Sequence, residues 1–149
     1  MNVVGIGTEI VECPRIGRMI EHHGELFLRR VYTEREIRFC QSRRHAIEHF
    51  AAHWAAKEAI FRALGTNWTR GVAWTDVEVR DARVGRAIVR VGGPAKALAV
   101  RLGIADIHVT LAHCRTYATA TALALTAPPR DPGATPAPPP AADEPGLDN

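Results

Sequence analysis

Glu58 and Glu9 are the residues of this sequence whose type and position best suit chemistry. Glu58 lies in segment 45–64, where apolar residues recur at helical spacing. On such a helix it falls about 40° from Trp54, inside the apolar stripe. An ionised carboxylate in that position is costly unless a positive charge meets it. Glu58 therefore either pairs with a basic side chain or helps to hold a cation.

Glu9 follows a short apolar segment, 3–8, that predicts a strand and contains Gly5 and Gly7. Strand alternation puts both glycines and Glu9 on one face, with room beside the carboxylate. Ile10 stands where a dinucleotide-binding G-x-G-x-x-G would need its third glycine, so we reject that motif and expect another chain segment to approach the glycines closely. A lone glutamate is most often solvated or paired with arginine. Two that meet in space would suit Mg²⁺, which takes one or two carboxylates together with waters and phosphate oxygens.

Three cationic side chains, His53, Lys57 and Arg62, surround Glu58 on the same helix. Arg62 follows Glu58 by four residues, so the simplest interpretation is an i, i+4 ion pair contributing about 0.2–0.5 kcal/mol. The functional alternative is that these cations bind phosphate groups beside a metal. His108 lies on a predicted strand, where a histidine is more often packed and hydrogen-bonded than a ligand. No cysteine or histidine pair has zinc-site spacing.

These residues have to be positioned by an α+β fold in which a mostly antiparallel sheet packs against one long helix and shorter helices. Gly65 ends the long helix, and Thr33 with Glu36 forms a capping-box pattern. The predicted helices are 14–22, 33–39, 44–64 and 94–102. The predicted strands are 3–8, 74–79, 87–91, 107–112 and 117–125, with a polar turn around Gly85.

Composition predicts one domain, residues 1–126, and a disordered Pro/Ala-rich tail, residues 127–149. The chain carries +3 and the tail −3, so the domain carries +6, with eight arginines between residues 15 and 44. Such a surface attracts acidic partners or is simply well solvated. Nucleic acid is disfavoured because few aromatic residues accompany the arginines. Three widely spaced cysteines, no signal peptide and no long apolar run predict a cytoplasmic protein outside the membrane.

Three segments in chain order resemble the holo-acyl-carrier-protein synthase family of small bacterial 4′-phosphopantetheinyl transferases. They are GIGTEIVECPRI at 5–16, FAAHWAAKEAIFRALGTN at 50–67 and IHVTLAHCRTYATATAL at 107–123. The combination of W/F-A-A-K-E-A with A-L-G-T is fairly specific, whereas GIGT alone is weak. The resemblance covers nearly all of residues 3–125.

The resemblance implies Mg²⁺-dependent transfer of phosphopantetheine from coenzyme A to a serine of an acyl carrier protein, releasing 3′,5′-ADP. It also implies a homotrimer with sites at subunit interfaces. Glu9 and Glu58 match the metal ligands of the family, and Glu58 and Lys57 match the catalytic K-E pair. The matching coenzyme A residues are Arg62, His108, His53, Gly65 and Thr66. The matching carrier-docking residues are Arg15 and, by position, Arg18 and Arg30.

Four positions depart from the family pattern. Glu9 replaces aspartate, His53 replaces arginine, Arg62 replaces lysine and Asn67 replaces the last glycine of A-L-G-T-G. The longer carboxylate at position 9 changes the reach toward a metal and could favour Mn²⁺ over Mg²⁺. The departures also leave open a non-catalytic relative that binds carrier protein or coenzyme A without transfer.

Overall fold

A five-stranded antiparallel sheet and a central helix dominate the computed structural model, which describes residues 1–81 and 87–129. The strand order is β1-β5-β4-β3-β2, so β1 and β2 are the two edges of the sheet. The strands are β1 (Val3–Glu12), β2 (Val77–Asp81), β3 (Ala87–Val91), β4 (Ile104–His113) and β5 (Tyr117–Thr126). The predicted turn at Gly85 and the predicted tail beyond residue 129 lie outside the described residues.

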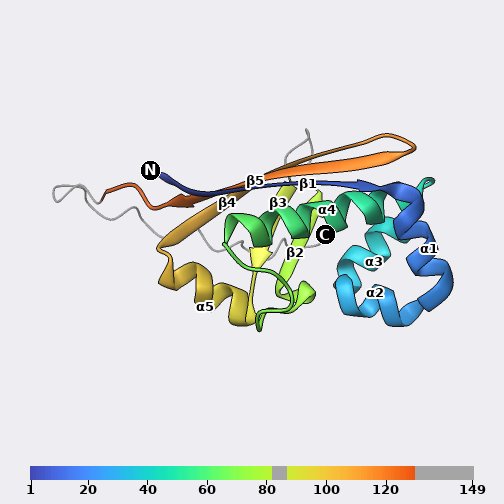
Figure 1. Cartoon of the computed structure of the whole chain (residues 1–149), viewed down its shortest axis with the longest axis horizontal. Coiled ribbons are helices and arrows are strands. Elements are labelled where there is room, and N and C mark those ends of the chain that lie inside the picture. Colours follow the sequence, from blue (N-terminus) through green and yellow to red (C-terminus); the bar gives the residue numbers. More distant parts are fainter. Residues whose placement is uncertain (82–86, 130–149) are drawn as a thin grey trace, which may run out of the picture.

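Helix α4 (Ala46–Ala63) lies along the inner face of the sheet, and the shorter helices pack around it (Figure 1). These are α1 (Cys13–His23), α2 (Glu25–Val31), α3 (Glu34–Gln41) and α5 (Gly93–Arg101), with one 3₁₀ turn, η1 (Trp74–Asp76). Helices α1 to α3 cluster at one end of α4, and α5 lies near the other (Figure 1). The α+β prediction is therefore confirmed.

The structure differs from the sequence-based prediction at two places. Segment 24–32, for which the sequence predicts no element, contains α2, which follows α1 after Gly24, a residue at φ +51°. Trp74 was assigned to a strand, but it opens η1, and β2 begins at Val77. The capping box at α3 is confirmed, since Thr33 Oγ1 accepts from the Glu36 N–H and Glu36 Oε1 accepts from the Thr33 N–H.

Helix α4 is buried on most of its circumference and not only along one apolar stripe. The sheet covers one side and α1 to α3 cover another, so small residues such as Ala55, Ala56 and Ala59 are fully buried. Trp54, Glu58 and Arg62 are the exceptions in its middle and last turns, where each remains partly or fully exposed. Within the described residues, no helix combines the length and the apolar character needed to cross a membrane.

Candidate active site

Two glycines bring strand β1 against helix α4. A Cβ atom built on Gly5 would lie 1.9 Å from the Ala63 carbonyl oxygen, and one built on Gly7 would lie 1.9 Å from the Ala59 carbonyl oxygen. No other residue type fits at that separation. The expectation that a backbone approaches these glycines is confirmed, and the approach carries Glu9, two residues after Gly7, toward the last turns of α4.

One face of α4 looks into a large pocket. Trp54, Glu58 and Arg62 follow one another at intervals of four residues, so they form a single row along the helix. All three line a pocket of about 900 Å³, to which β1 contributes Glu9 and α1 contributes Arg15. The pocket therefore brings two carboxylates together with the guanidinium groups of Arg15 and Arg62.

Glu9 is held on both carboxylate oxygens. Oε1 accepts the Ile10 N–H at 2.9 Å, and Oε2 lies 2.8 Å from Arg62 Nη2. The other terminal nitrogen of Arg62 donates to the Thr8 carbonyl at 2.5 Å. Arg62, which sequence spacing paired with Glu58, is thus fixed on β1 and not on its own helix.

Glu58 lies near Glu9, and its pKa is raised. Burial raises the pKa of Glu58, and the nearby negative charge of Glu9 raises it further, against the attraction of Arg62 and Arg15. Two carboxylates that repel each other in one pocket are a donor set that a divalent cation would neutralise. The set fits Mg²⁺ or Mn²⁺, whose remaining ligands would be waters and phosphate oxygens. Among the described residues, no third His, Cys, Asp or Glu joins them in a ligand cluster.

Part of the pocket lining is aromatic. Trp74 lies between Trp54 and Trp68, with ring centroids 5.5 Å and 6.2 Å apart. Arg15 lies over Trp54 at 5.7 Å and Arg30 over Trp68 at 5.5 Å, both within cation–π range. The wall therefore combines apolar surface with positive charge at its rim. The sequence does not predict this wall, because the three tryptophans are spread over 21 positions of the chain.

Lys57 and His53, which were expected near phosphate groups, do not line this pocket. Lys57 is fully buried, and its Nζ lies 2.7 Å from Glu36 Oε1 while donating to the carbonyls of Trp74 and Val77. His53 Nδ1 lies 3.2 Å from Glu36 Oε2, and its ring stacks on Phe39. Both side chains project from α4 toward α3, because a step of one residue turns the helix by about 100°.

Glu36, His53 and Lys57 form a buried network, the Glu36 network, in which opposite charges compensate each other. Burial would raise the pKa of Glu36, but hydrogen bonds from His53 and Lys57 and the charge of Lys57 lower it overall. Burial lowers the pKa of Lys57, and its attraction to Glu36 opposes that change. The network joins α3, α4 and β2, since Glu36 Oε2 also accepts the Val79 N–H at 3.3 Å. It is a structural support behind the pocket.

His108 lies on the outer face of the sheet, away from the pocket of its own chain. His108 pairs across the strands with Leu123, and Leu123 pairs with Ile6, so these three side chains share one face of the sheet. Ile6 and Glu9 are three residues apart on β1 and point to opposite faces, so His108 and Glu9 lie on opposite faces. The Nε2 atom of His108 lies 2.8 Å from Asp106 Oδ2. Gly65 and Thr66 follow α4, with Gly65 at φ +69° and the Thr66 N–H donating to the Phe61 carbonyl, and they do not line the pocket.

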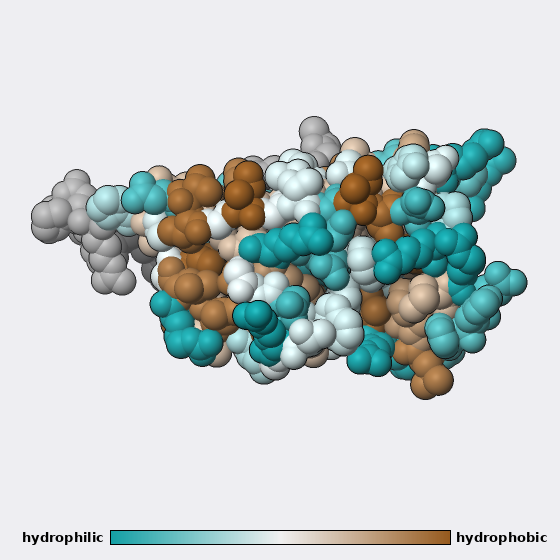
Figure 2. Space-filling view, viewed as in Figure 1, coloured by the Kyte–Doolittle hydropathy of each residue, from teal (hydrophilic) through white to brown (hydrophobic). Residues whose placement is uncertain are grey.

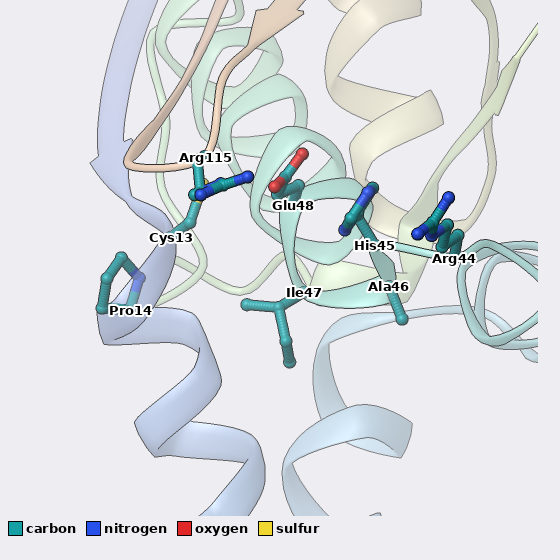
Figure 3. A pocket seen from close by; sticks show the side chains of 8 residues that line it. All are labelled: Cys13, Pro14, Arg44, His45, Ala46, Ile47, Glu48 and Arg115. Carbon is teal, nitrogen blue, oxygen red and sulfur yellow. The ribbon is translucent and has the colours of Figure 1, made fainter.

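A second pocket, of about 430 Å³, was not foreseen from the sequence. The cations of this pocket come from Arg44 and His45, just before α4, and from Arg115 in the β4–β5 turn. Glu48 supplies a carboxylate. Figure 3 shows Arg115 lying above Cys13 and directed toward Glu48, with His45 and Arg44 on the far side. The basic residues before α4 are the part of this pocket that the sequence could indicate. That the β4–β5 turn lies beside them can be seen only in the folded structure.

Comparisons with known proteins agree with this geometry. Residues 5–122 match the family described as the 4′-phosphopantetheinyl transferase superfamily. The holo-[acyl-carrier-protein] synthase of Rhodopirellula baltica is 46% identical over 120 residues, covering 80% of this chain and 95% of the relative. That of Koribacter versatilis is 43% identical over 121 residues, 81% and 97% of the two chains. The crystal structure of a holo-(acyl-carrier-protein) synthase from Bacillus anthracis, in complex with CoA (3′,5′-ADP), superposes with a TM-score of 0.69 at 28% identity, covering 84% of this chain and 98% of that one. With most of its length matched by sequence and by structure, the chain belongs to the 4′-phosphopantetheinyl transferase superfamily, among the holo-acyl-carrier-protein synthases.

Proposed function

We propose that this protein transfers 4′-phosphopantetheine from coenzyme A to a serine hydroxyl of an apo acyl carrier protein and releases 3′,5′-ADP. The observation that carries the proposal is the meeting of Glu9 and Glu58 in one pocket with Arg62 and Arg15. Attack on a pyrophosphate needs its negative charge neutralised and the nucleophile aligned. Family membership identifies the donor and the acceptor, and the pocket supplies groups suited to both needs.

Glu9 and Glu58 would hold the divalent ion, Mg²⁺ or Mn²⁺. Once bound, the ion supplies charge neutralisation for the pyrophosphate and polarises its phosphorus centre. Arg62 and Arg15 would bind the remaining phosphate oxygens, and the tryptophan wall would pack against the pantetheine arm. Glu58 is also the candidate acceptor of the serine proton, through a carboxylate oxygen or an intervening water. Lys57 is left out of the chemistry because protein acceptors hold its ammonium group.

The carrier protein would dock on the basic end formed by α1 and α2. Arg15, Arg18 and Arg30 are exposed there, next to the apolar side chains Met19 and Leu26, the latter 83% exposed. Figure 2 shows hydrophilic side chains around apolar ones over this end of the molecule. Acyl carrier proteins are acidic, so opposite charge would steer their approach and lose strength with added salt.

A homotrimer would explain the separation of His108 from the pocket. The outer face of the sheet exposes Val4, Ile6 and Ile10 of β1 together with Ile88 of β3, each between 49% and 65% exposed. Exposed apolar side chains gathered on one face are typical of a subunit interface. His108 shares that face, so it would act in the pocket of a neighbouring subunit. The cations of the second pocket would likewise serve a coenzyme A phosphate bound between subunits.

Intact-mass spectrometry of an apo carrier protein tests the proposal. After incubation with this protein, coenzyme A and Mg²⁺, we expect the carrier to gain the mass of one phosphopantetheine group. A carrier variant with the acceptor serine replaced by alanine is the control and should gain nothing. Binding of coenzyme A without any gain in carrier mass would instead favour the non-catalytic alternative raised by the four departures.

A further inference from the structure

Arg62 occupies the carboxylate that a metal ion would need. Its Nη2 lies 2.8 Å from Glu9 Oε2 while Nη1 donates to the Thr8 carbonyl, so the guanidinium bridges two acceptors of β1. The remaining oxygen of Glu9 accepts the Ile10 N–H. Each oxygen of Glu9 therefore already has one partner, and a divalent ion shared with Glu58 would compete with the positively charged guanidinium for Oε2.

The guanidinium is the partner that can leave. The Arg62 side chain is 51% exposed, so water can replace its contacts at little cost, whereas the Ile10 N–H is fixed in the strand backbone. The Glu9 side chain is only 14% exposed and would stay behind as the ligand. A bound divalent ion also repels a guanidinium placed on the same carboxylate.

We propose that Arg62 is a latch on Glu9 that a divalent ion releases, and that released Arg62 then binds the phosphates of the nucleotide. The inference rests on the metal site of the proposed function and adds a coupling to it. The ion frees the arginine for phosphate, and phosphate draws the arginine away from Glu9. Because coupling between two ligands is reciprocal, metal and nucleotide then raise each other's affinity by the same factor.

Titration of the full chain with Mn²⁺, followed by electron paramagnetic resonance, tests the latch without relying on turnover. In the absence of nucleotide, Arg62→Met should bind Mn²⁺ about two- to fivefold more tightly than the wild type, the range expected for losing a partly exposed ion pair. Adding 3′,5′-ADP should raise Mn²⁺ affinity in the wild type and leave it nearly unchanged in Arg62→Met. A protein-free titration corrects for ions bound by the nucleotide.

Arg15→Met is the matched control, since Arg15 also lines the pocket and attracts Glu58 but makes no described hydrogen bond to Glu9. It should give a smaller gain in Mn²⁺ affinity and keep the coupling to 3′,5′-ADP. Arg62→Lys, which keeps one charge but cannot bridge both acceptors, should lie between wild type and Arg62→Met.

An Arg62→Met variant whose Mn²⁺ affinity equals that of Arg15→Met, or falls below that of the wild type, overturns the latch. That result would not decide the proposed function, which the carrier-protein mass assay tests separately. Absence of Mn²⁺ binding to both wild type and Arg62→Met would overturn the latch and the metal site together.

Discussion

Glu58 is the single residue on which the proposed chemistry depends most. It is half-buried, its charge is opposed by Glu9, and it stands in the same helical row as Arg62. A charge in such a place costs free energy in the empty protein, and a bound cation offsets that cost. Stored electrostatic strain of this kind is typical of functional sites.

Glu58→Gln should abolish transfer while leaving the fold intact. The amide has nearly the same shape but no negative charge, so metal affinity should fall. Loss of groups that only support a metal ligand typically costs 10- to 100-fold, and loss of the ligand itself should lower kcat/KM by at least about 100-fold. Turnover of apo carrier protein measures the effect. The melting temperature should stay level or rise, because repulsion from Glu9 is removed, and wild-type-like turnover would refute the role.

The contact of β1 with α4 is the element-scale feature that makes the site. Gly7→Ala would place a Cβ 1.9 Å from the Ala59 carbonyl oxygen, so strand and helix must separate. We expect a loss of about 1–3 kcal/mol in unfolding free energy from overpacking, and a fall in transfer because Glu9 and Glu58 move apart. Denaturant unfolding and the carrier assay together measure it.

Gly17→Ala is the matched control for that variant. Gly17 lies in α1, and its added Cβ would meet only the Ile47 side chain at an ordinary 3.4 Å. Alanine also suits a helix better than glycine. Stability should hold or improve, and an equal loss in both variants would contradict the argument from close approach.

The Glu36 network ties α3, α4 and β2 together, and its removal should destabilise the fold. Glu36→Gln leaves the buried Lys57 ammonium without its carboxylate, which typically costs about 3–5 kcal/mol. The double variant Glu36→Gln/Lys57→Met should recover much of the lost unfolding free energy, because no unpaired buried charge remains. Urea unfolding of the two single variants and the double variant forms the test, and strictly additive losses would contradict the coupling.

The same network makes a prediction about pH. The pKa of Glu36 is lowered in the folded state, so its stabilising contribution is complete above the ordinary glutamate pKa of about 4.3 and is lost as pH falls through the lowered value. The acid limb of the unfolding free energy, measured between neutral pH and pH 3, should be shallower in Glu36→Gln. An unchanged acid limb would mean that Glu36 is not the group being titrated.

Most elements could be predicted from the sequence because local signals set them. Gly65 ends α4, Thr33 and Glu36 cap α3, and alternation defines the strands. Helix α2 was missed because its short segment offers no periodicity long enough to detect. The separation of Lys57 from Glu58 was missed for another reason: adjacent residues on a helix point to different neighbours, and the resemblance names residues without saying which side of α4 is open.

At the scale of the whole molecule, the outer sheet face should decide the oligomeric state. Ile6→Asp puts a charge in the middle of that apolar face, so we expect trimers to dissociate into monomers in light scattering after size exclusion. Val100→Asp is the matched control, because Val100 is equally exposed but lies on α5. Dissociation of the trimer by Val100→Asp alone would contradict the proposed interface. A wild-type protein that is already monomeric would contradict it as well.

No reading of the sequence alone could place His108 relative to Glu58. Both were expected at one site, yet the sheet separates them within the chain, because His108 and Ile6 share one face while Glu9 and Gly7 share the other. In the proposed trimer, which of these residues meet would depend on how the chains pack together. That information lies in surface complementarity and not in local sequence pattern.

The measurement that tests the central claim most directly compares the carrier-protein mass spectrum with and without available divalent metal. With Mg²⁺ present, this protein should convert apo carrier to the form carrying one phosphopantetheine, and with excess EDTA in place of Mg²⁺ the carrier should stay unmodified. Equal conversion in EDTA would contradict the account, because two carboxylates without a cation cannot bring a pyrophosphate into this pocket.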